Sequence, residues 1–303
     1  MIDFHRIQIE NKADYEKILL SVPTRGCEYS FANLYLWGRQ QIAFLHGCVA
    51  FFAHYSGCSV YPYPIGTGDR RAVLELILED AEQRGIPCRI CCLSPADREE
   101  LEQWFPGRFL FRTSRDSFDY VYDVNDLADL RGRKFQRKRN HVNRFRAIHP
   151  DFSVEPITGE NLELAQALTQ QWFKDRLERD PEGNYLLEQV ALDRTFSRYK
   201  DLGMEGLLLN CGGKVVAMTM GSRLSQDTMD IHFEKALEDV DGAYAAINCE
   251  FARHLRLAHP EILFLDREDD LGLEGLRKAK LSYNPHHMLE KYWAYLGDDV
   301  DDP

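Results

Sequence analysis

Apolar and polar residues follow a regular order along the first half of the chain. Alternating apolar residues predict strands, and apolar residues three and four apart predict helices. The strands expected here are 4–9, 41–45, 48–55, 59–68, 87–94 and 109–124. The helices expected are 12–22, 29–40, 69–85 and 94–105. His46-Gly47 is a hairpin signal between two of these strands.

The second half repeats this order of elements. Its expected strands are 152–158, 206–213, 214–224, 228–237, 261–266 and 286–296. Its expected helices are 161–177, 185–202, 242–257 and 272–280. Gly212-Gly213 predicts a second hairpin. Each half therefore has the order β-α-α-β-β-β-α-β-α-β.

That order is the layout of the GNAT fold, the fold of acyl-CoA N-acyltransferases. We expect an α/β (α+β) protein of two tandem GNAT-like domains, each a mixed sheet flanked by helices. The expected domains are 1–128 and 150–297. A basic bridging helix at 129–149 joins them, and an acidic tail at 298–303 ends the chain.

Composition excludes several classes of protein. Hydrophobic residues make up 44% and charged residues 28%, as in globular proteins. The net charge is −12, from 37 Lys and Arg against 49 Asp and Glu, so a surface that is basic throughout is excluded. The most apolar stretch, 42–53, is too short to cross a bilayer, and the N-terminus lacks the pattern of a signal peptide. We expect a cytoplasmic location, with peripheral membrane contact left open.

The eight cysteines fit a reducing compartment. Cys88, Cys91 and Cys92 form a C-x-x-C-C group that zinc ligands can share. No further Cys or His pair follows at ligand spacing, and the segment 87–94 has the pattern of a buried strand. We therefore favour strand packing and expect no metal site.

A basic segment between the halves reverses the sign of the chain's charge. From Arg131 to Arg146 it has no Asp or Glu, and its eight basic residues are Arg131, Arg133, Lys134, Arg137, Lys138, Arg139, Arg144 and Arg146. Phe135, Val142 and Phe145 recur at helical spacing, so one side of a helix can pack. The charged sides suit a polyanion such as tRNA, an anionic lipid headgroup or a nucleotide. Pairing with the chain's own carboxylates is the alternative.

Four segments resemble one bacterial family. Residues 134–145, KFQRKRNHVNRF, resemble its K-x-x-x-K-R-N-x-x-x-x-F signature. Residues 266–285, DREDDLGLEGLRKAKLSYNP, resemble a second signature, which has Asn where this chain has Asp266. Residues 29–37 and 61–69 match the family's first half. The family is related to the C-terminal catalytic part of phosphatidylglycerol lysyltransferases.

The resemblance implies a tandem GNAT fold and, by analogy, transfer of an aminoacyl group from tRNA. It covers nearly the whole chain. The lipid-modifying relatives carry membrane-spanning segments, which this sequence lacks. Four residues around the K-R-N signature are the candidates for binding tRNA or another anion: Arg137, Lys138, Arg139 and Asn140.

Acyl transfer requires a base for the acceptor, a polarised carbonyl and a held donor. In a GNAT fold these groups gather where the fourth and fifth strands separate, which in the second half are 228–237 and 261–266. Glu234 shares a strand face with His232, whereas Lys235 points the opposite way. Glu234 is the candidate catalytic base, or else a strand-end carboxylate in an ion pair. Tyr283 is the candidate acid for the leaving group, or else a packed residue.

Polar residues near these strands are candidates for substrate binding: Glu268, Asp269, Asp270, Arg277, Lys280, Tyr244 and Asn248. The acidic residues could bind an ammonium group, or cap the next helix and pair with its basic residues. Their spacing matches no EF-hand loop, so no metal is expected. Arg277 and Lys280 share a helix face that could bind a phosphate or carboxylate, or clamp the acidic run.

Acyl-CoA enzymes of this fold bind pyrophosphate with a glycine-rich loop at a helix N-terminus. The corresponding segment, 237–248, keeps Gly242 but carries Glu238, Asp239 and Asp241, which would repel pyrophosphate. In the first half Gly66 and Gly68 are available, but Asp69 has the position of a helix N-cap, which favours a turn.

We therefore expect a transferase that moves an aminoacyl group from aminoacyl-tRNA to an amine or hydroxyl acceptor, either a small molecule or a lipid headgroup. No bound cofactor is expected, and aminoacyl-tRNA or acyl-CoA would be the co-substrate. An acyl-CoA-dependent N-acyltransferase is one alternative. A non-catalytic module that binds an anionic ligand is another.

Overall fold

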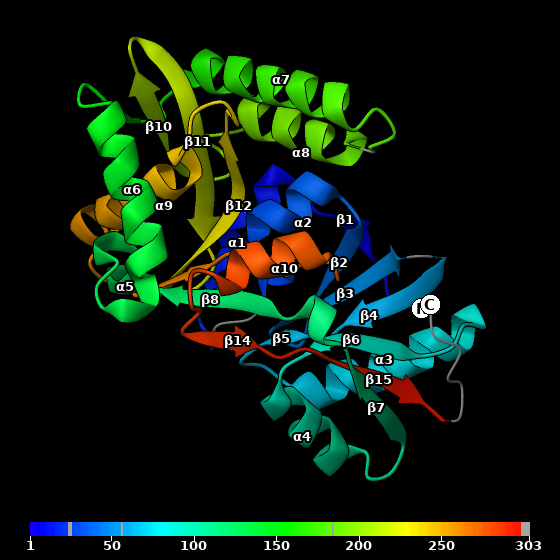
Figure 1. Cartoon of the computed structure of the whole chain (residues 1–303). Helices are drawn as coiled ribbons and strands as arrows, with labels where there is room; N and C mark the ends of the chain where they lie inside the picture. Colours follow the sequence, from blue (N-terminus) through cyan, green and yellow to red (C-terminus); the bar gives the residue numbers. More distant parts are fainter. Residues whose placement is uncertain (24–25, 56, 184, 298–303) are drawn as a thin grey trace. The chain divides into compact units, whose positions relative to one another are not determined.

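The computed structural model describes residues 1–23, 26–55, 57–183 and 185–297 (Figure 1). These residues form two compact units. The first unit comprises Met1–Asp119, Asp269–Gly272 and the chain from Met288 onward, and the second comprises Tyr120–Glu268 and Leu273–His287. The expected acidic tail, 298–303, lies outside the described residues.

A mixed sheet forms the centre of the first unit. Its order is β1-β2-β3-β4-β6-β15-β7, with β5 paired to β3. β4 and β6 run parallel, and the other paired neighbours run antiparallel. The strands are β1 (His5–Arg6), β2 (Gln40–Leu45), β3 (Cys48–Tyr55), β4 (Cys58–Pro62), β5 (Ile65–Gly66), β6 (Arg89–Leu93), β7 (Phe109–Thr113) and β15 (Tyr292–Leu296). The hairpin predicted at His46-Gly47 is confirmed, since Leu45 pairs with Cys48.

Helices pack on this sheet as the apolar spacing predicted. They are α1 (Lys12–Leu19), α2 (Phe31–Trp37), α3 (Arg70–Arg84) and α4 (Pro95–Trp104), with 3-10 turns at Ile9–Asn11, Cys27–Tyr29 and Arg115–Ser117. Leu74 and Ile77 of α3 are fully buried in one cluster with Ile90 of β6. The Asp69 side chain accepts the Ala72 N–H at 3.0 Å, which confirms the predicted N-cap of α3.

The second unit is also built on a mixed sheet, in the order β14-β8-β13-β12-β11-β10-β9. β12 and β13 run parallel, whereas β9, β10, β11 and β12 pair antiparallel in succession. The strands are β8 (Asp119–Asp123), β9 (Ser153–Pro156), β10 (Glu205–Cys211), β11 (Lys214–Arg223), β12 (Thr228–Ala236), β13 (Phe264–Asp266) and β14 (His287–Leu289). The Gly212-Gly213 hairpin is confirmed, since Cys211 pairs with Lys214.

The second unit has helices on both faces of its sheet. They are α5 (Val124–Asp129), α6 (Gln136–Ile148), α7 (Leu162–Arg179), α8 (Leu186–Ser197), α9 (Ala243–Ala258) and α10 (Glu274–Leu281), all labelled in Figure 1. The Lys235 ammonium lies 3.6 Å from the ring centroid of Trp172 on α7, whereas Glu234 accepts a hydrogen bond from Asn248 on α9. Successive strand residues point to opposite faces. α7 and α9 therefore lie on opposite faces of the strand.

The last strand of each half differs from the prediction. Residues 286–296 form two strands, β14 and β15, and β15 belongs to the sheet of the first unit, between β6 and β7. Residues 109–124 likewise contain β7 and β8, and β8 belongs to the sheet of the second unit, beside β13. The physical reason is that alternation reports which face of a strand is buried, but not which neighbour the backbone pairs with.

The segment 129–149, expected as a basic helix bridging two domains, contains a 3-10 turn at Arg133–Phe135 and the helix α6, and it lies within the second unit. Its expected apolar face is confirmed, because Phe135, Val142 and Phe145 are no more than 2% exposed. α6 packs closely on the turn before α9. A Cβ at Gly242 would lie 2.8 Å from the His141 carbonyl oxygen, and Gly242 has φ +84°. Both the backbone angle and the close approach require glycine here.

We predict that Gly242→Ala destabilises the protein more than Gly213→Ala. Both residues have positive φ, which costs roughly 1–2 kcal/mol for an L side chain. A Cβ at Gly213 meets nothing within 4 Å in the part of the chain that the structure describes, whereas one at Gly242 also displaces α6. Overpacking of that kind adds about 1–3 kcal/mol. Chemical denaturation of the two variants measures the difference, and equal losses would contradict the packing of α6 on α9.

Candidate active site where strands β12 and β13 separate

The candidate site lies where two parallel strands separate. β12 pairs with β13 through three residue pairs, of which Asp230 with Asp266 is the last. β12 then continues to Ala236, while the chain beyond Asp266 leaves the sheet in a loop toward α10. Ligands of open α/β sheets bind beyond the carboxyl ends of parallel strands that diverge in this way. The groups on the part of β12 beyond this pairing and on the loop can therefore act together.

Glu234 is held in this opening by an ion pair and an amide. Its Oε1 lies 2.8 Å from Nη2 of Arg267, and its Oε2 accepts a hydrogen bond of 3.2 Å from Asn248. The two charged side chains are 10% and 15% exposed. Burial acts to lower the pKa of Arg267, but Glu234, Tyr122 and Tyr283 together raise that pKa overall. The carboxylate is therefore fixed in place and faces a permanent positive charge.

Lys138 and Tyr283 complete the group around Glu234. The Lys138 ammonium lies 3.7 Å from the ring centroid of Tyr283, and the Arg267 guanidinium carbon lies 4.9 Å from the same centroid. Burial, reinforced by the charge of Arg267, lowers the pKa of Lys138 to about 8, although Glu234 opposes the shift. Burial raises the pKa of the Tyr283 phenol well above its ordinary value. Lys138 is thus the stronger acid of the two.

Lys280 fixes the loop that carries Arg267. Its buried ammonium donates to the carbonyl oxygen of Arg267 and, at 3.1 Å, to that of Glu268. The carbonyl oxygen of Lys280 accepts a hydrogen bond of 2.8 Å from the Tyr122 hydroxyl. Lys280 therefore acts on the backbone of the chain itself, and it positions Arg267 opposite Glu234.

The remaining predicted substrate-binding residues are dispersed. Asp269 and Asp270 belong to the first unit. There the fully buried Asp270 lies 3.5 Å from Arg115, and Asp269 accepts the Leu271 N–H at 3.3 Å. Asp269 therefore bonds within its own loop, and Asp270 contacts Arg115 of the same unit.

Tyr244 of α9 and Arg277 of α10 are the last two predicted substrate-binding residues. The Tyr244 hydroxyl accepts a hydrogen bond of 3.0 Å from the Trp172 indole on α7. Arg277 is half-buried on α10. The structure thus brings together Glu234, Asn248 and Tyr283 of the predicted set.

About half of the basic segment pairs with the protein's own carboxylates. The ion pairs are Arg131–Asp129 at 3.2 Å, Lys134–Asp126 at 2.8 Å, Arg144–Asp241 at 3.1 Å and Arg146–Glu250 at 2.6 Å. Arg139 donates to the carbonyl oxygens of Leu130 and Gly132. Arg133, Arg137 and Asn140 are exposed, and neither arginine forms an ion pair within the described ranges. The surface left for an outside anion is therefore narrower than the sequence suggested.

The acidic residues before α9 are also paired. Glu238 forms ion pairs with Arg176 at 3.4 Å and with Arg179, and Asp241 pairs with Arg144. These arginines offset the repulsion that the sequence predicted toward a pyrophosphate. The close approach of α6 to Gly242 limits access to this helix end instead.

Two functional residues were missed by sequence reasoning. Arg267 stands between the acidic residues of the matched signature, and nothing in that run indicates that it faces Glu234. Lys138 was assigned to the anion surface, but the structure places its ammonium over Tyr283. The available signal was its position on α6, three residues after the buried Phe135 and four before the buried Val142.

The equivalent strand separation in the first unit is closed by a side chain. β4 and β6 pair in parallel through Tyr61 with Ile90 and Pro62 with Cys91. Beyond these pairs the hydroxyl of Tyr29, which is 1% exposed, donates to the carbonyl oxygens of Tyr63 at 3.0 Å and Cys92 at 3.3 Å. The backbone oxygens there already have a partner, so the second unit is the better place for a substrate.

The first unit also buries an ionic cluster that sequence reasoning missed. Lys291, 4% exposed, lies 2.7 Å from Asp119 Oδ1 and also pairs with Glu28. Asp119 Oδ2 accepts the Cys27 N–H at 2.9 Å. Burial raises the pKa of Glu28 to about 7, against the effect of Lys291. The members come from separate elements, so no sequence motif joins them.

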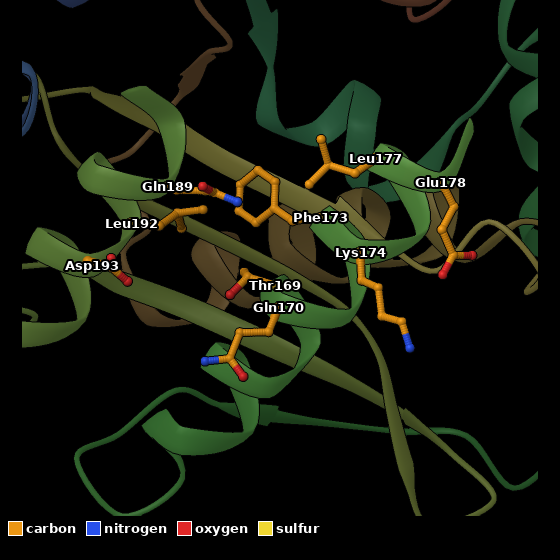
Figure 2. A pocket seen from close by; sticks show the side chains of 9 residues that line it. All are labelled: Thr169, Gln170, Phe173, Lys174, Leu177, Glu178, Gln189, Leu192 and Asp193. Carbon is orange, nitrogen blue, oxygen red and sulfur yellow. The ribbon is translucent and has the colours of Figure 1, made fainter. Parts of the chain in front are cut away.

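A groove between α7 and α8 lies apart from the Glu234 site. Figure 2 shows its lining, which encloses about 640 Å³: Thr169, Gln170, Phe173, Lys174, Leu177, Glu178, Gln189, Leu192 and Asp193. Lys235 lies 5.6 Å from the ring centroid of Phe173, so the groove belongs to the face of β12 opposite Glu234. We therefore do not assign the transfer site to this groove.

The fold and this strand separation define a GNAT-like transferase architecture. The family described as "Phosphatidylglycerol lysyltransferase, C-terminal" matches residues 21–295, and the chain belongs to that family. A conserved protein of unknown function from Bacteroides thetaiotaomicron is 37% identical, with a TM-score of 0.92 over 98% of this chain and 100% of that chain.

Lysyltransferase relatives share the fold at lower identity. The C-terminal domain of a protein described as a lysylphosphatidylglycerol synthetase of Agrobacterium fabrum is 14% identical, with a TM-score of 0.69 over 95% of this chain and 93% of that chain. L-PGS from Bacillus licheniformis is 15% identical, with a TM-score of 0.65 over 94% and 92%.

An uncharacterised protein of Mycoplasmoides gallisepticum is 25% identical over 180 residues, which are 58% of this chain. The match spans 55% of that relative's length. Within the described ranges, no helix is both long and apolar enough to cross a membrane.

We predict that Lys291→Met destabilises the protein by about 3–5 kcal/mol, because it leaves the buried Asp119 without its countercharge. Lys278→Met is the matched control. Lys278 pairs with Glu274 at 2.6 Å, but both side chains are more than 70% exposed, so its loss costs about 0–1 kcal/mol. Urea denaturation measures both variants. Similar midpoints would show that the buried cluster does not support the first unit.

Proposed function

We propose that the protein transfers an aminoacyl group from aminoacyl-tRNA to a hydroxyl or amine acceptor at the Glu234 site. The observation that carries the proposal is the meeting of a buried carboxylate with two cations, Lys138 and Arg267, where the parallel strands separate. Membership of the lysyltransferase family supports aminoacyl transfer in particular. The donor exists in the cytoplasm, where we place the reaction.

Each group has a role in the proposed reaction. Glu234 takes the proton of the acceptor while the acceptor's oxygen or nitrogen forms a bond to the ester carbonyl carbon of the aminoacyl-tRNA. Arg267 and Lys138 stabilise the oxyanion that develops on the carbonyl oxygen. The bond from that carbon to the ribose oxygen then breaks, and Lys138 donates its proton to the leaving oxygen. We prefer Lys138 to Tyr283 as the acid because its pKa is about 8, whereas that of the buried phenol is raised far above neutrality.

The direct test follows labelled lysine from lysyl-tRNA. Vesicles containing phosphatidylglycerol test a lipid hydroxyl acceptor, and soluble amines such as lysine test a small one. Label that moves into the organic phase or into a soluble amide supports the proposal. Deacylation that stays at the no-protein rate with every acceptor would overturn it.

Glu234→Gln tests the base. We expect the transfer rate to fall by about 100-fold or more, since general bases contribute 10² to 10⁴. Glu188→Gln is the matched control, because Glu188 pairs with Lys235 at 2.6 Å on the opposite face of β12. Circular dichroism should show both variants folded. If the two variants lose activity equally, Glu234 is not the base.

The pH dependence tests Lys138. The ammonium form is the proposed acid, so the rate of single-turnover transfer should fall as the pH rises above about 8. Lys138→Arg keeps the positive charge, but arginine does not titrate in this range. The variant should therefore lack the proton donor, and its transfer rate should no longer fall above about pH 8. Spontaneous ester hydrolysis is subtracted at each pH. A descending limb that persists in the variant would assign the titration to another group.

Salt dependence tests the tRNA surface. Arg133 and Arg137 are the exposed cations of the basic segment that lack an ion pair within the described residues. Changing both to Gln should weaken tRNA binding and reduce the slope of log K against log salt by about 1.4–1.8. The control is Arg144→Gln with Arg146→Gln, which removes cations already paired with Asp241 and Glu250. Equal effects of the two pairs, or no tRNA binding at low salt, would contradict this surface.

A further inference from the structure

A second group of ligating side chains lies beside the Glu234 site. Asp230 and His232 come from β12, and Glu268 comes from the loop after β13. One ligand atom from each lies within 4.8 Å of the other two. The side chain of His232 is 1% exposed and that of Asp230 is fully buried. Three ligating groups, of which the Asp230 and His232 side chains are buried, therefore converge at a place that the proposed transfer reaction does not use.

The imidazole of His232 points one nitrogen into this group. Its Nδ1 lies 3.5 Å from Asp230 Oδ2 and 3.6 Å from Glu268 Oε1. Within the described part of the chain, Nδ1 has no hydrogen-bond partner although it is buried. This nitrogen is therefore nearly equidistant from the two carboxylates.

These separations are those of two ligands on one metal ion. Zinc binds nitrogen and oxygen ligands at about 2.0–2.2 Å, so two tetrahedral ligands lie roughly 3.3–3.6 Å apart. The other ring nitrogen, Nε2, lies 2.8 Å from the Ser222 hydroxyl. Such a hydrogen bond behind the ring fixes the orientation of a metal-binding histidine.

The backbone holds Glu268 in an uncommon conformation. Its φ is +58°, in the left-handed region that non-glycine residues rarely adopt. Its N–H donates to Asp266 Oδ1 at 2.8 Å, and its carbonyl oxygen accepts from the Tyr120 N–H at 3.1 Å and from Lys280. Strained residues held by several contacts cluster at ligand sites. The surrounding structure thus fixes the point from which the Glu268 side chain extends.

We propose that Asp230, His232 and Glu268 bind one divalent cation of the zinc type. An imidazole nitrogen with two carboxylate oxygens suits Zn²⁺, and the imidazole disfavours Mg²⁺. Three protein ligands leave a fourth position for water. The ion joins β12 to the loop after β13, next to Arg267, and it therefore stabilises the loop that positions this residue opposite Glu234.

The test measures metal binding directly, without tRNA or acceptor. The full chain is stripped with a chelator and titrated with Zn²⁺ by calorimetry, and with Co²⁺ by visible absorption. We expect one equivalent to bind, with the d–d bands of tetrahedral Co²⁺ and no thiolate charge-transfer band. A thiolate band would place the metal on the cysteines and overturn the proposal. No binding would overturn it as well.

His232→Gln should weaken Zn²⁺ binding at least 100-fold. His254→Gln is the matched control, because His254 of α9 contacts a single carboxylate, that of Glu205, at 2.7 Å. The control should bind as the parent chain does. If His232→Gln does not fold, Glu268→Gln replaces it, since that side chain is 27% exposed and tolerates substitution better. Unchanged Zn²⁺ affinity in a folded ligand variant would overturn the proposal, whatever the outcome of the transfer assay.

Discussion

The separation of β12 from β13 is the constraint on which the candidate site depends. Their parallel pairing ends at Asp230 and Asp266, so the polar groups beyond that point lose their neighbouring strand. Backbone and side-chain groups left in this way require other partners. Lys280 supplies them for the loop, and Arg267 and Asn248 supply them for Glu234. The same separation that disrupts the sheet therefore creates a buried polar opening.

Buried charge gives this opening its chemical character. Two cations, Lys138 and Arg267, lie against one aromatic ring, and burial, together with the charge of Arg267, lowers the pKa of Lys138. Such a pair is stable only while an anion compensates it, and Glu234 is that anion. An arrangement of this kind favours a reaction in which negative charge develops on a bound substrate, because the cations are already in place.

The separation of two parallel strands is occupied differently in the two units. In the first unit, Tyr29 occupies the separation of β4 from β6, and the buried Lys291 cluster adds rigidity nearby. In the second unit, the equivalent opening presents Glu234, and Asp230 and His232 lie on the same strand. Under the proposed function, repetition of the fold leaves one copy to serve stability while the other carries the reactive side chains.

The sequence by itself determined most of the order of elements, but not α5 or the division of 109–124 and 286–296 into two strands each. It determined both hairpins, the α3 cap and the apolar face of α6, because these depend on local spacing and turn chemistry. It also indicated Glu234, since its place on the fourth strand follows from that order. Tertiary structure alone decided that β8 joins the sheet of the second unit and β15 that of the first. It also decided that Lys138 faces Tyr283 and that Arg267 pairs with Glu234. Each of these joins residues far apart in the chain. Hydrophobic periodicity specifies that a residue is buried, but its partner is selected only when the whole core packs.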